Sequence, residues 1–189
     1  LPNMKTFFDA FISYGRADSK VFATKLHQRL TELGFRIWFD QQDIPLGVDF
    51  QNQIDDGIEK SHNFLFIIAP HSVKSAYCLK EIQLAVQLNK RIIPLLHVEP
   101  MDCWDKMHPI IQKINWIYFQ DNKDDFEKSL AGLLQVIDHQ SDYVRQHTEI
   151  LVKALEWSRH HKQTNYLLIG EEQKQAQSWL KVKRSEEHT

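Results

Sequence analysis

Residues 63–70, NFLFIIAP, decide the fold of this chain. The apolar residues Phe64–Ala69 form its longest apolar run, which lies between the polar Asn63 and Pro70. A short continuous run of this kind is typical of a strand that is buried on both faces. Such strands occur in parallel sheets, which helices cover on both sides. We therefore predict a buried strand at 63–69 that ends at Pro70.

Similar patterns recur on both sides of this segment. We predict further strands at 7–14, 35–39, 91–98 and 116–119. Helical spacing predicts helices between them: from a cap at Asp18 or Ser19 to Gly34, from Phe50 onward, from Ser72 or Ser75 to about Asn89, and from Asp124 to about His139. Residues 101–114 are expected to be irregular or briefly helical. Pro94 lacks an N–H and predicts an edge or a bulge in its strand.

The alternation of strands and helices predicts an α/β fold. We expect a flavodoxin-like sheet of five parallel strands in the order 2-1-3-4-5, with helices on both faces. After residue 140 only helices follow, one capped by Ser141 and one at about 171–184. We expect a domain at 5–140 and a helical extension at 141–189. Trp157 and Trp179 suggest that the extension packs on the domain, on another subunit or on a further module downstream.

Composition excludes several classes of function. The chain has 189 residues, 42% of them hydrophobic and 25% charged, as in an average globular domain. A net charge of −2 gives no reason to expect a nucleic-acid or membrane partner. With two cysteines, Cys78 and Cys103, and no leading apolar segment, we expect a cytoplasmic protein without a disulfide framework. Neither a His-Glu-x-x-His nor a Cys-x-x-Cys pattern occurs, so no metal site is predicted.

The strand order predicts where a ligand would bind. In open α/β sheets this place is the crevice beyond the carboxyl ends of the strands, where the strand order reverses. Here the crevice lies between the first and third strands. The loop after the first strand carries Ser13, Gly15 and Arg16. The loop and helix start after the third strand carry His71, Ser72, Ser75, Tyr77 and Glu81. We expect Ser72 and Ser75 to act as helix caps rather than as ligands.

Glu81 has a distinctive position on its predicted helix. If Ile82 is the centre of the apolar face, Glu81 lies about 100° away, on the flank of the buried stripe. Tyr77 lies one turn before it on the same face. A carboxylate beside an aromatic ring can hold a ribose and stack a planar group. The ordinary alternative is a solvated helix glutamate next to Lys80.

The chain resembles the TIR (Toll/interleukin-1 receptor) domain family over about residues 5–140. Three segments carry the resemblance: FDAFISYGR at 8–16, the loop from Asp40 to Gly47 that leads into Phe50, and FLFIIAPHSVKSAYCLKEI at 64–82. The family contains scaffolds that signal by self-association and enzymes that cleave NAD+ at the nicotinamide–ribose bond. By contrast, a response-regulator receiver would need acidic residues at the ends of the first and third strands, which this chain lacks.

The resemblance implies roles for particular residues. In the enzymes the catalytic glutamate ends a Cys-x-x-Glu pattern, which here is Cys78-Leu79-Lys80-Glu81. Glu81 is thereby the expected catalytic residue. Arg16 matches a position that contacts the nucleotide. Gly15 stands where a basic residue is more usual, and Tyr77 stands where many members have Trp.

The resemblance also implies a mobile second loop, formed by Asp43, Ile44, Pro45, Leu46 and Gly47, that packs on a neighbouring TIR domain. The expected binding residues are therefore Gly15, Arg16, Pro45, Gly47, Phe50 and Tyr77. The expected function is that of an NAD+ glycohydrolase that releases nicotinamide and linear or cyclic ADP-ribose, with NAD+ as substrate and no prosthetic group. It would be active on self-association, in bacterial signalling or antiphage defence. The alternative is a non-catalytic TIR scaffold.

Overall fold

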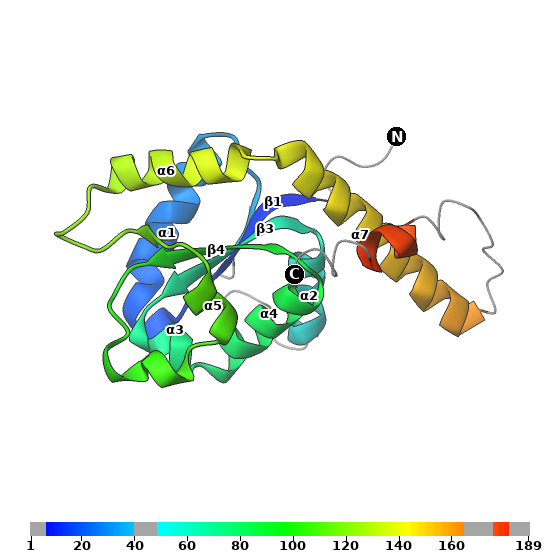
Figure 1. Cartoon of the computed structure of the whole chain (residues 1–189), viewed down its shortest axis with the longest axis horizontal. Coiled ribbons are helices and arrows are strands. Elements are labelled where there is room, and N and C mark those ends of the chain that lie inside the picture. The colour runs from blue at the N-terminus through cyan, green and yellow to red at the C-terminus, as the bar shows by residue number, and fades with distance from the viewer. Residues whose placement is uncertain (1–6, 40–48, 165–175, 182–189) are drawn as a thin grey trace.

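The computed structural model describes residues 7–39, 49–164 and 176–181. Within these ranges one sheet of parallel strands has the order β2-β1-β3-β4-β5 (Figure 1). The strands are β1 (Phe8–Ser13), β2 (Ile37–Trp38), β3 (Ser61–Ile68), β4 (Arg91–Leu96) and β5 (Ile117–Tyr118). The predicted sheet and its strand order are confirmed.

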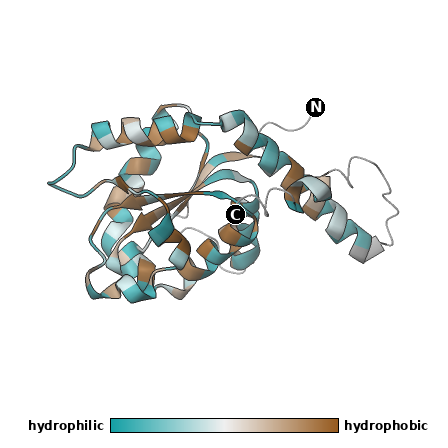
Figure 2. Cartoon of the chain, viewed as in Figure 1, coloured by the Kyte–Doolittle hydropathy of each residue, from teal (hydrophilic) through white to brown (hydrophobic). Residues whose placement is uncertain are grey.

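Helices cover both faces of the sheet. One face carries α1 (Arg16–Glu32) and α6 (Phe126–Asp138), and the other carries α2 (Phe50–Glu59), α3 (Pro70–Lys74), α4 (Ala76–Gln87) and α5 (Pro109–Lys113). A 3-10 turn, η1 (Met101–Lys106), precedes α5, and α7 (Ser141–Thr164) follows α6. The strands are largely hydrophobic, whereas polar residues mark the outer sides of the helices (Figure 2).

The central strand β3 supplies side chains to both hydrophobic cores. Every residue of β3 is buried. Leu65 and Ile67 pack toward α1 and α6, while Phe64, Phe66 and Ile68 pack toward α2, α4 and α5. Successive side chains of a strand point to opposite faces, so an unbroken apolar run is what a strand between two helical layers requires.

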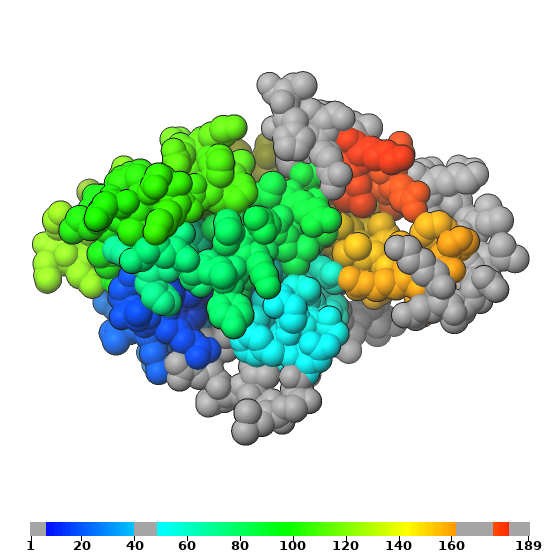
Figure 3. Space-filling model, turned by 90° about the horizontal axis from the view of Figure 1, so that it is seen from below, coloured from blue at the N-terminus to red at the C-terminus, as the bar shows by residue number. Residues whose placement is uncertain are grey.

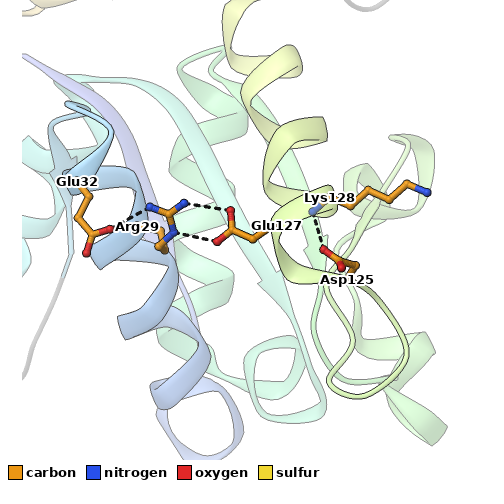
Figure 4. Close-up of polar contacts among 5 residues, drawn as sticks. All are labelled: Arg29, Glu32, Asp125, Glu127 and Lys128. Atoms are coloured by element: carbon orange, nitrogen blue, oxygen red, sulfur yellow. Dashed lines mark hydrogen bonds and ion pairs between the residues drawn. The ribbon is translucent and has the colours of Figure 1, made fainter.

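An exposed ion pair joins the two helices of the first face. Arg29 of α1 donates from Nε and Nη2 to the two carboxylate oxygens of Glu127 in α6, each at 3.0 Å, and from Nη1 to Glu32 at 2.9 Å (Figure 4). Asp125 caps α6 by accepting a hydrogen bond from the backbone N–H of Lys128. The predicted start of this helix at Asp124 is therefore two residues early.

Two predicted helix boundaries near the crevice are wrong. The first helix begins at Arg16, with Gly15 as its N-cap, rather than after Asp18 or Ser19. Ser19 is fully buried inside α1. The predicted helix from Ser72 or Ser75 is two helices, because the backbone is extended at Ser75, with ψ 126°. Ser75 caps α4 by accepting a hydrogen bond from the backbone N–H of Cys78. Ser72, the third residue of α3, accepts from the backbone N–H of Ala69, the N-cap of α3, and donates to the carbonyl of Ile67. Both serines therefore bond to the backbone at a helix start, as expected.

The predicted edge or bulge at Pro94 is wrong. Pro94 lies inside β4 and pairs with Phe66 of β3. Its missing N–H is nevertheless tolerated. The strand on the other side, β5, pairs only with Leu95 and Leu96. Among the described residues, Pro94 therefore pairs with β3 alone. On its other side no strand requires an N–H from Pro94, just as none would on an edge strand.

Buried polar contacts attach α7 to the sheet. Lys90, which is 7% exposed, donates from Nζ to the carbonyls of Glu59 at 2.7 Å and Ser61 at 2.8 Å, and to Thr148 Oγ1 of α7 at 3.5 Å. Arg159 of α7 donates to both carboxylate oxygens of Glu59, at 2.6 and 3.3 Å. The helix α7 therefore lies against the end of α2, as the space-filling view also shows (cyan and orange in Figure 3).

The second tryptophan of the extension also packs on α7. Trp179, in the short described helix at 176–181, lies 5.6 Å from Tyr143 and 5.1 Å from His147 between ring centroids. Trp157 stacks on His161 at 5.2 Å.

The division of the chain at residue 140 stays a prediction. Among the described helices, none is both long and apolar enough to cross a membrane.

His62 is a buried histidine whose surroundings disfavour its charged form. It is 9% exposed at the start of β3, stacks on Phe7 at 5.8 Å, and its Nδ1 has no hydrogen-bond partner. Burial is the main cause that lowers the pKa of His62 to about 4, below the 6.5 of an unfolded histidine. The unfolded chain therefore binds this proton first, and stability that is present above pH 6.5 is lost as the pH falls toward 4.

We expect the wild-type protein to lose about 2 kcal/mol of its free energy of unfolding through His62 between pH 7 and 4.5. Urea titrations at the two pH values measure this loss. His62→Phe keeps a ring against Phe7 and removes the titrating group, so its loss over the same range should be smaller by that amount. Equal losses in both proteins would show that His62 does not titrate in this way.

Candidate active site

A hollow of about 400 Å³ lies beyond the carboxyl ends of β1 and β3, where the strand order reverses. Its volume is within the usual range of ligand pockets, about 300–1,000 Å³. Figure 3 views this side of the molecule, where the start of α1 (blue) and α4 (green) lie near α2 (cyan). We call this cavity the Glu81 hollow. Its lining residues are Tyr14, Gly15, Arg16, Phe50, Ile54, His71, Ser75, Tyr77, Cys78 and Glu81.

Glu81 is half-buried in the second turn of α4. The structure places it on the flank of the apolar face, since Cys78, Ile82 and Ala85 are buried. One carboxylate oxygen, Oε1, accepts a hydrogen bond of 2.7 Å from Ser13 Oγ at the end of β1. The carboxylate is therefore tied to the sheet by one oxygen and lines the hollow.

Cys78 lies one turn before Glu81 and is 3% exposed. Burial, with the Glu81 charge as the next cause, raises the pKa of the Cys78 thiol to about 12. The sulfur is therefore a neutral thiol near pH 7, and it donates to the carbonyl of Tyr14 at 3.5 Å. A neutral buried thiol is a poor nucleophile, so Cys78 is not suited to act as one near pH 7.

Close packing against α3 accounts for Gly15. A Cβ at this position would lie 2.6 Å from His71 Nδ1 and 2.8 Å from the backbone N of Ser72. The backbone N–H of His71 in turn donates to Asp18 Oδ2 of α1 at 2.8 Å. A larger residue, such as the basic one that is more usual here in the family, would push the first turn of α1 away from α3.

The other predicted binding residues lie around the opening. Arg16 is the exposed first residue of α1, where the helix dipole also favours an anion. Phe50 begins α2 and is 37% exposed, and Tyr77, in the first turn of α4, is 68% exposed. Pro45 and Gly47 lie outside the described residues. The structure thus brings Gly15, Arg16, Phe50, Tyr77 and Glu81 together in one hollow.

A larger hollow, of about 480 Å³, shares Arg16 with the Glu81 hollow and is lined by Phe22, Phe119 and Phe126 but not by Glu81. Beside it, His97 bridges Ser19 Oγ at 2.8 Å and Asp121 Oδ2 at 2.9 Å. This contact resembles a Ser-His-Asp arrangement, but the Ser19 side chain is fully buried and cannot reach a substrate. We therefore take the Glu81 hollow as the candidate active site.

Several residues of the Glu81 hollow were not predicted from the sequence. Tyr14 and Ile54 line the hollow. The sequence pattern indicated only that Tyr14 ends a strand and that Ile54 lies on the apolar face of a helix. Ser13 was noted as polar, but its bond to Glu81 was not predicted, because the two residues are 68 positions apart in the chain. The apolar spacing that marked Ile54 as buried was the only signal that could have placed it near the site.

Comparisons with known proteins agree with this architecture. A family model described as "TIR domain" matches residues 10–134. A solved TIR domain, from the Toll-related receptor TRR-2 of Hydra magnipapillata, superposes with a TM-score of 0.56 at 23% identity and covers 69% of this chain and 98% of that one. At that identity the likeness shows the fold alone.

Two curated relatives differ in kind. The NAD(+) hydrolase TcpC of Escherichia coli is 28% identical over 100 residues, which are 50% of this chain and 33% of TcpC. Toll-like receptor 2 type-2 of Gallus gallus is 30% identical over 106 residues, 53% of this chain and 14% of the receptor. The chain thus matches a third or less of the length of these relatives. Because the family model spans well over half of the chain, the chain belongs to the TIR domain family.

Proposed function

We propose that this TIR domain cleaves the nicotinamide–ribose bond of NAD+. The observation that carries the proposal is the Glu81 carboxylate, which lines a ligand-sized hollow at the reversal of strand order and has one oxygen tied to Ser13. Several homologues, TcpC among them, are NAD+ hydrolases, and this supports the proposal.

The chemistry suits a single carboxylate. When the bond between ribose C1′ and the pyridinium nitrogen breaks, nicotinamide leaves as a neutral molecule with the bonding electron pair. The ribose then carries a positive charge, as in glycoside cleavage. Glu81 would stabilise this cation and accept hydrogen bonds from the ribose hydroxyls. Water then adds at C1′ and releases a proton, which gives ADP-ribose; attack by another atom of the same molecule gives a cyclic product.

The remaining residues of the hollow have complementary roles in the proposal. The guanidinium of Arg16, at the start of α1, would bind the pyrophosphate. Tyr77 would stack on a planar ring of the substrate. Both Tyr77 and Phe50 expose aromatic surface at the opening, which supports the further proposal that a second TIR domain closes the hollow during turnover. We extend the proposal to bacterial signalling or antiphage defence in the cytoplasm, in line with the Escherichia coli relative.

Incubation with NAD+ tests this function. The protein is assayed from dilute to concentrated solution and clustered on beads, and chromatography measures nicotinamide. We expect nicotinamide release, with a rate per molecule that rises with concentration because assembly completes the site. If no condition releases nicotinamide, the domain is a non-catalytic scaffold, the reading that the receptor relative favours. A rate per molecule that is independent of concentration would remove self-association from the proposal.

A further inference from the structure

Ser13 occupies a position that its strand determines. In β1, Ala10 and Ile12 pack toward α1 and α6, whereas Phe11 packs toward α2 and α4. Side chains alternate along a strand, so Ser13 points to the same face as Phe11 and therefore toward α4. There its hydroxyl, 1% exposed, donates to Glu81 Oε1 at 2.7 Å.

We propose that Ser13 is a positioning residue for NAD+ cleavage, whose hydroxyl holds Oε1 of the Glu81 carboxylate in the orientation that the reaction requires. The inference rests on the function proposed above and goes beyond it, because it assigns the group that orients the catalytic residue. A serine hydroxyl has a single proton to donate, and in this structure it is given to Glu81.

The need for such an anchor follows from the length of the glutamate side chain. Three rotatable bonds separate its carboxylate from the α4 backbone, so each contact that holds the carboxylate reduces the number of rotamers that the side chain occupies. A displacement of about 1 Å at a reacting group can cost ~10²-fold in rate. The Ser13 contact fixes the carboxylate relative to the sheet, which also carries the start of α1 and Arg16.

The surroundings of Ser13 make this contact specific. Cys78, on the same side of α4 as Glu81, donates to the carbonyl of Tyr14, the residue after Ser13. Two adjacent contacts, Ser13 to Glu81 and Cys78 to Tyr14, therefore tie the end of β1 to the first two turns of α4. Because the Cys78 thiol is neutral near pH 7, it adds no negative charge that would repel the carboxylate.

The test compares kinetic constants for the clustered wild-type protein, Ser13→Ala and Ser13→Thr. We expect kcat of Ser13→Ala to fall about 50-fold with KM changed less than about threefold, because the orientation of the reacting group is lost while substrate contacts remain. The acid limb of its pH–rate profile should move to higher pH, since a hydrogen bond to the ionised carboxylate is lost. Ser13→Thr keeps the hydroxyl and should recover at least part of the rate.

Ser19→Ala is the matched control, since Ser19 is another fully buried serine whose hydroxyl contacts His97 rather than Glu81. Its kcat should stay within about threefold of wild type. A kcat of Ser13→Ala within that same range, or a lower kcat with an unmoved pH profile and a lowered thermal midpoint, would overturn the inference and leave the proposed function intact. Failure of the wild-type protein to release nicotinamide would instead overturn both.

Discussion

Glu81→Gln should lower nicotinamide release by about 10³-fold, equivalent to about 4 kcal/mol of transition-state stabilisation. The substitution keeps the shape of the side chain and an oxygen that can accept the Ser13 hydrogen bond, but it removes the negative charge. The charge is what the developing ribosyl cation requires, so the loss should fall on kcat far more than on KM. Chromatography of nicotinamide from the clustered protein, over a range of NAD+ concentrations, measures both constants.

Glu149→Gln provides the control for this result, because Glu149 is an exposed glutamate on α7, outside the Glu81 hollow. It should turn over NAD+ like the wild-type protein. The thermal midpoint of Glu81→Gln should also match wild type, since the side chain is half-buried and retains a partner in Ser13. Turnover by Glu81→Gln within tenfold of wild type would remove the carboxylate from the mechanism, whatever activity the domain has.

The sheet was predictable because its strands are short apolar runs. Burial on both faces requires such runs, and β3 meets this requirement along its whole length. The start of α1 was not predictable from its capping residues, since Gly15 caps it without a side chain and Asp18 bonds to His71 of α3 instead. The break at Ser75 was missed for a similar reason, because one extended residue leaves the apolar spacing on both sides intact.

The location of the site was predictable from the sequence, but its internal contacts were not. Strand order and helical spacing placed Glu81, Tyr77 and Arg16 around one crevice, and the structure brings them together. The contacts that adjust the site were not predictable, because periodicity describes one element at a time. The bond from Ser13 to Glu81 and the approach of Gly15 to His71 each depend on how two elements pack.

Lys90→Met should destabilise the protein, and more strongly at alkaline pH. Without the amine, the carbonyls of Glu59 and Ser61 lose a buried donor, and each such loss costs ~1–3 kcal/mol. Methionine fills a similar volume, so packing changes little. At low pH the substitution also removes a buried charge, which offsets part of the loss. We expect a decrease in the free energy of unfolding of about 1 kcal/mol at pH 6 and about 3 kcal/mol at pH 9.

The pH dependence follows from the environment of Lys90. Burial lowers the pKa of its ammonium to about 7, below the 10.5 of an unfolded lysine, although the charge of Glu59 opposes this shift. The unfolded chain therefore holds the proton at pH values where the folded protein has released it. Stability rises as the pH increases from about 7 toward 10.5, by about 2 kcal/mol between pH 7 and 9. The neutral amine still has two N–H groups for the two carbonyls.

Urea titrations at pH 6, 7, 8 and 9 measure the difference in free energy of unfolding between wild type and Lys90→Met. Groups that titrate alike in both proteins cancel in this difference. Lys60→Met is the matched control, since this neighbouring lysine forms a surface pair with Asp56 at 3.0 Å. Its effect should stay within about 0.5 kcal/mol at every pH. A wild-type advantage over Lys90→Met that does not change with pH would show that the amine stays charged throughout. No advantage at any pH would mean that the contacts joining Glu59, Ser61 and Thr148 through Lys90 do not stabilise the docking of α7.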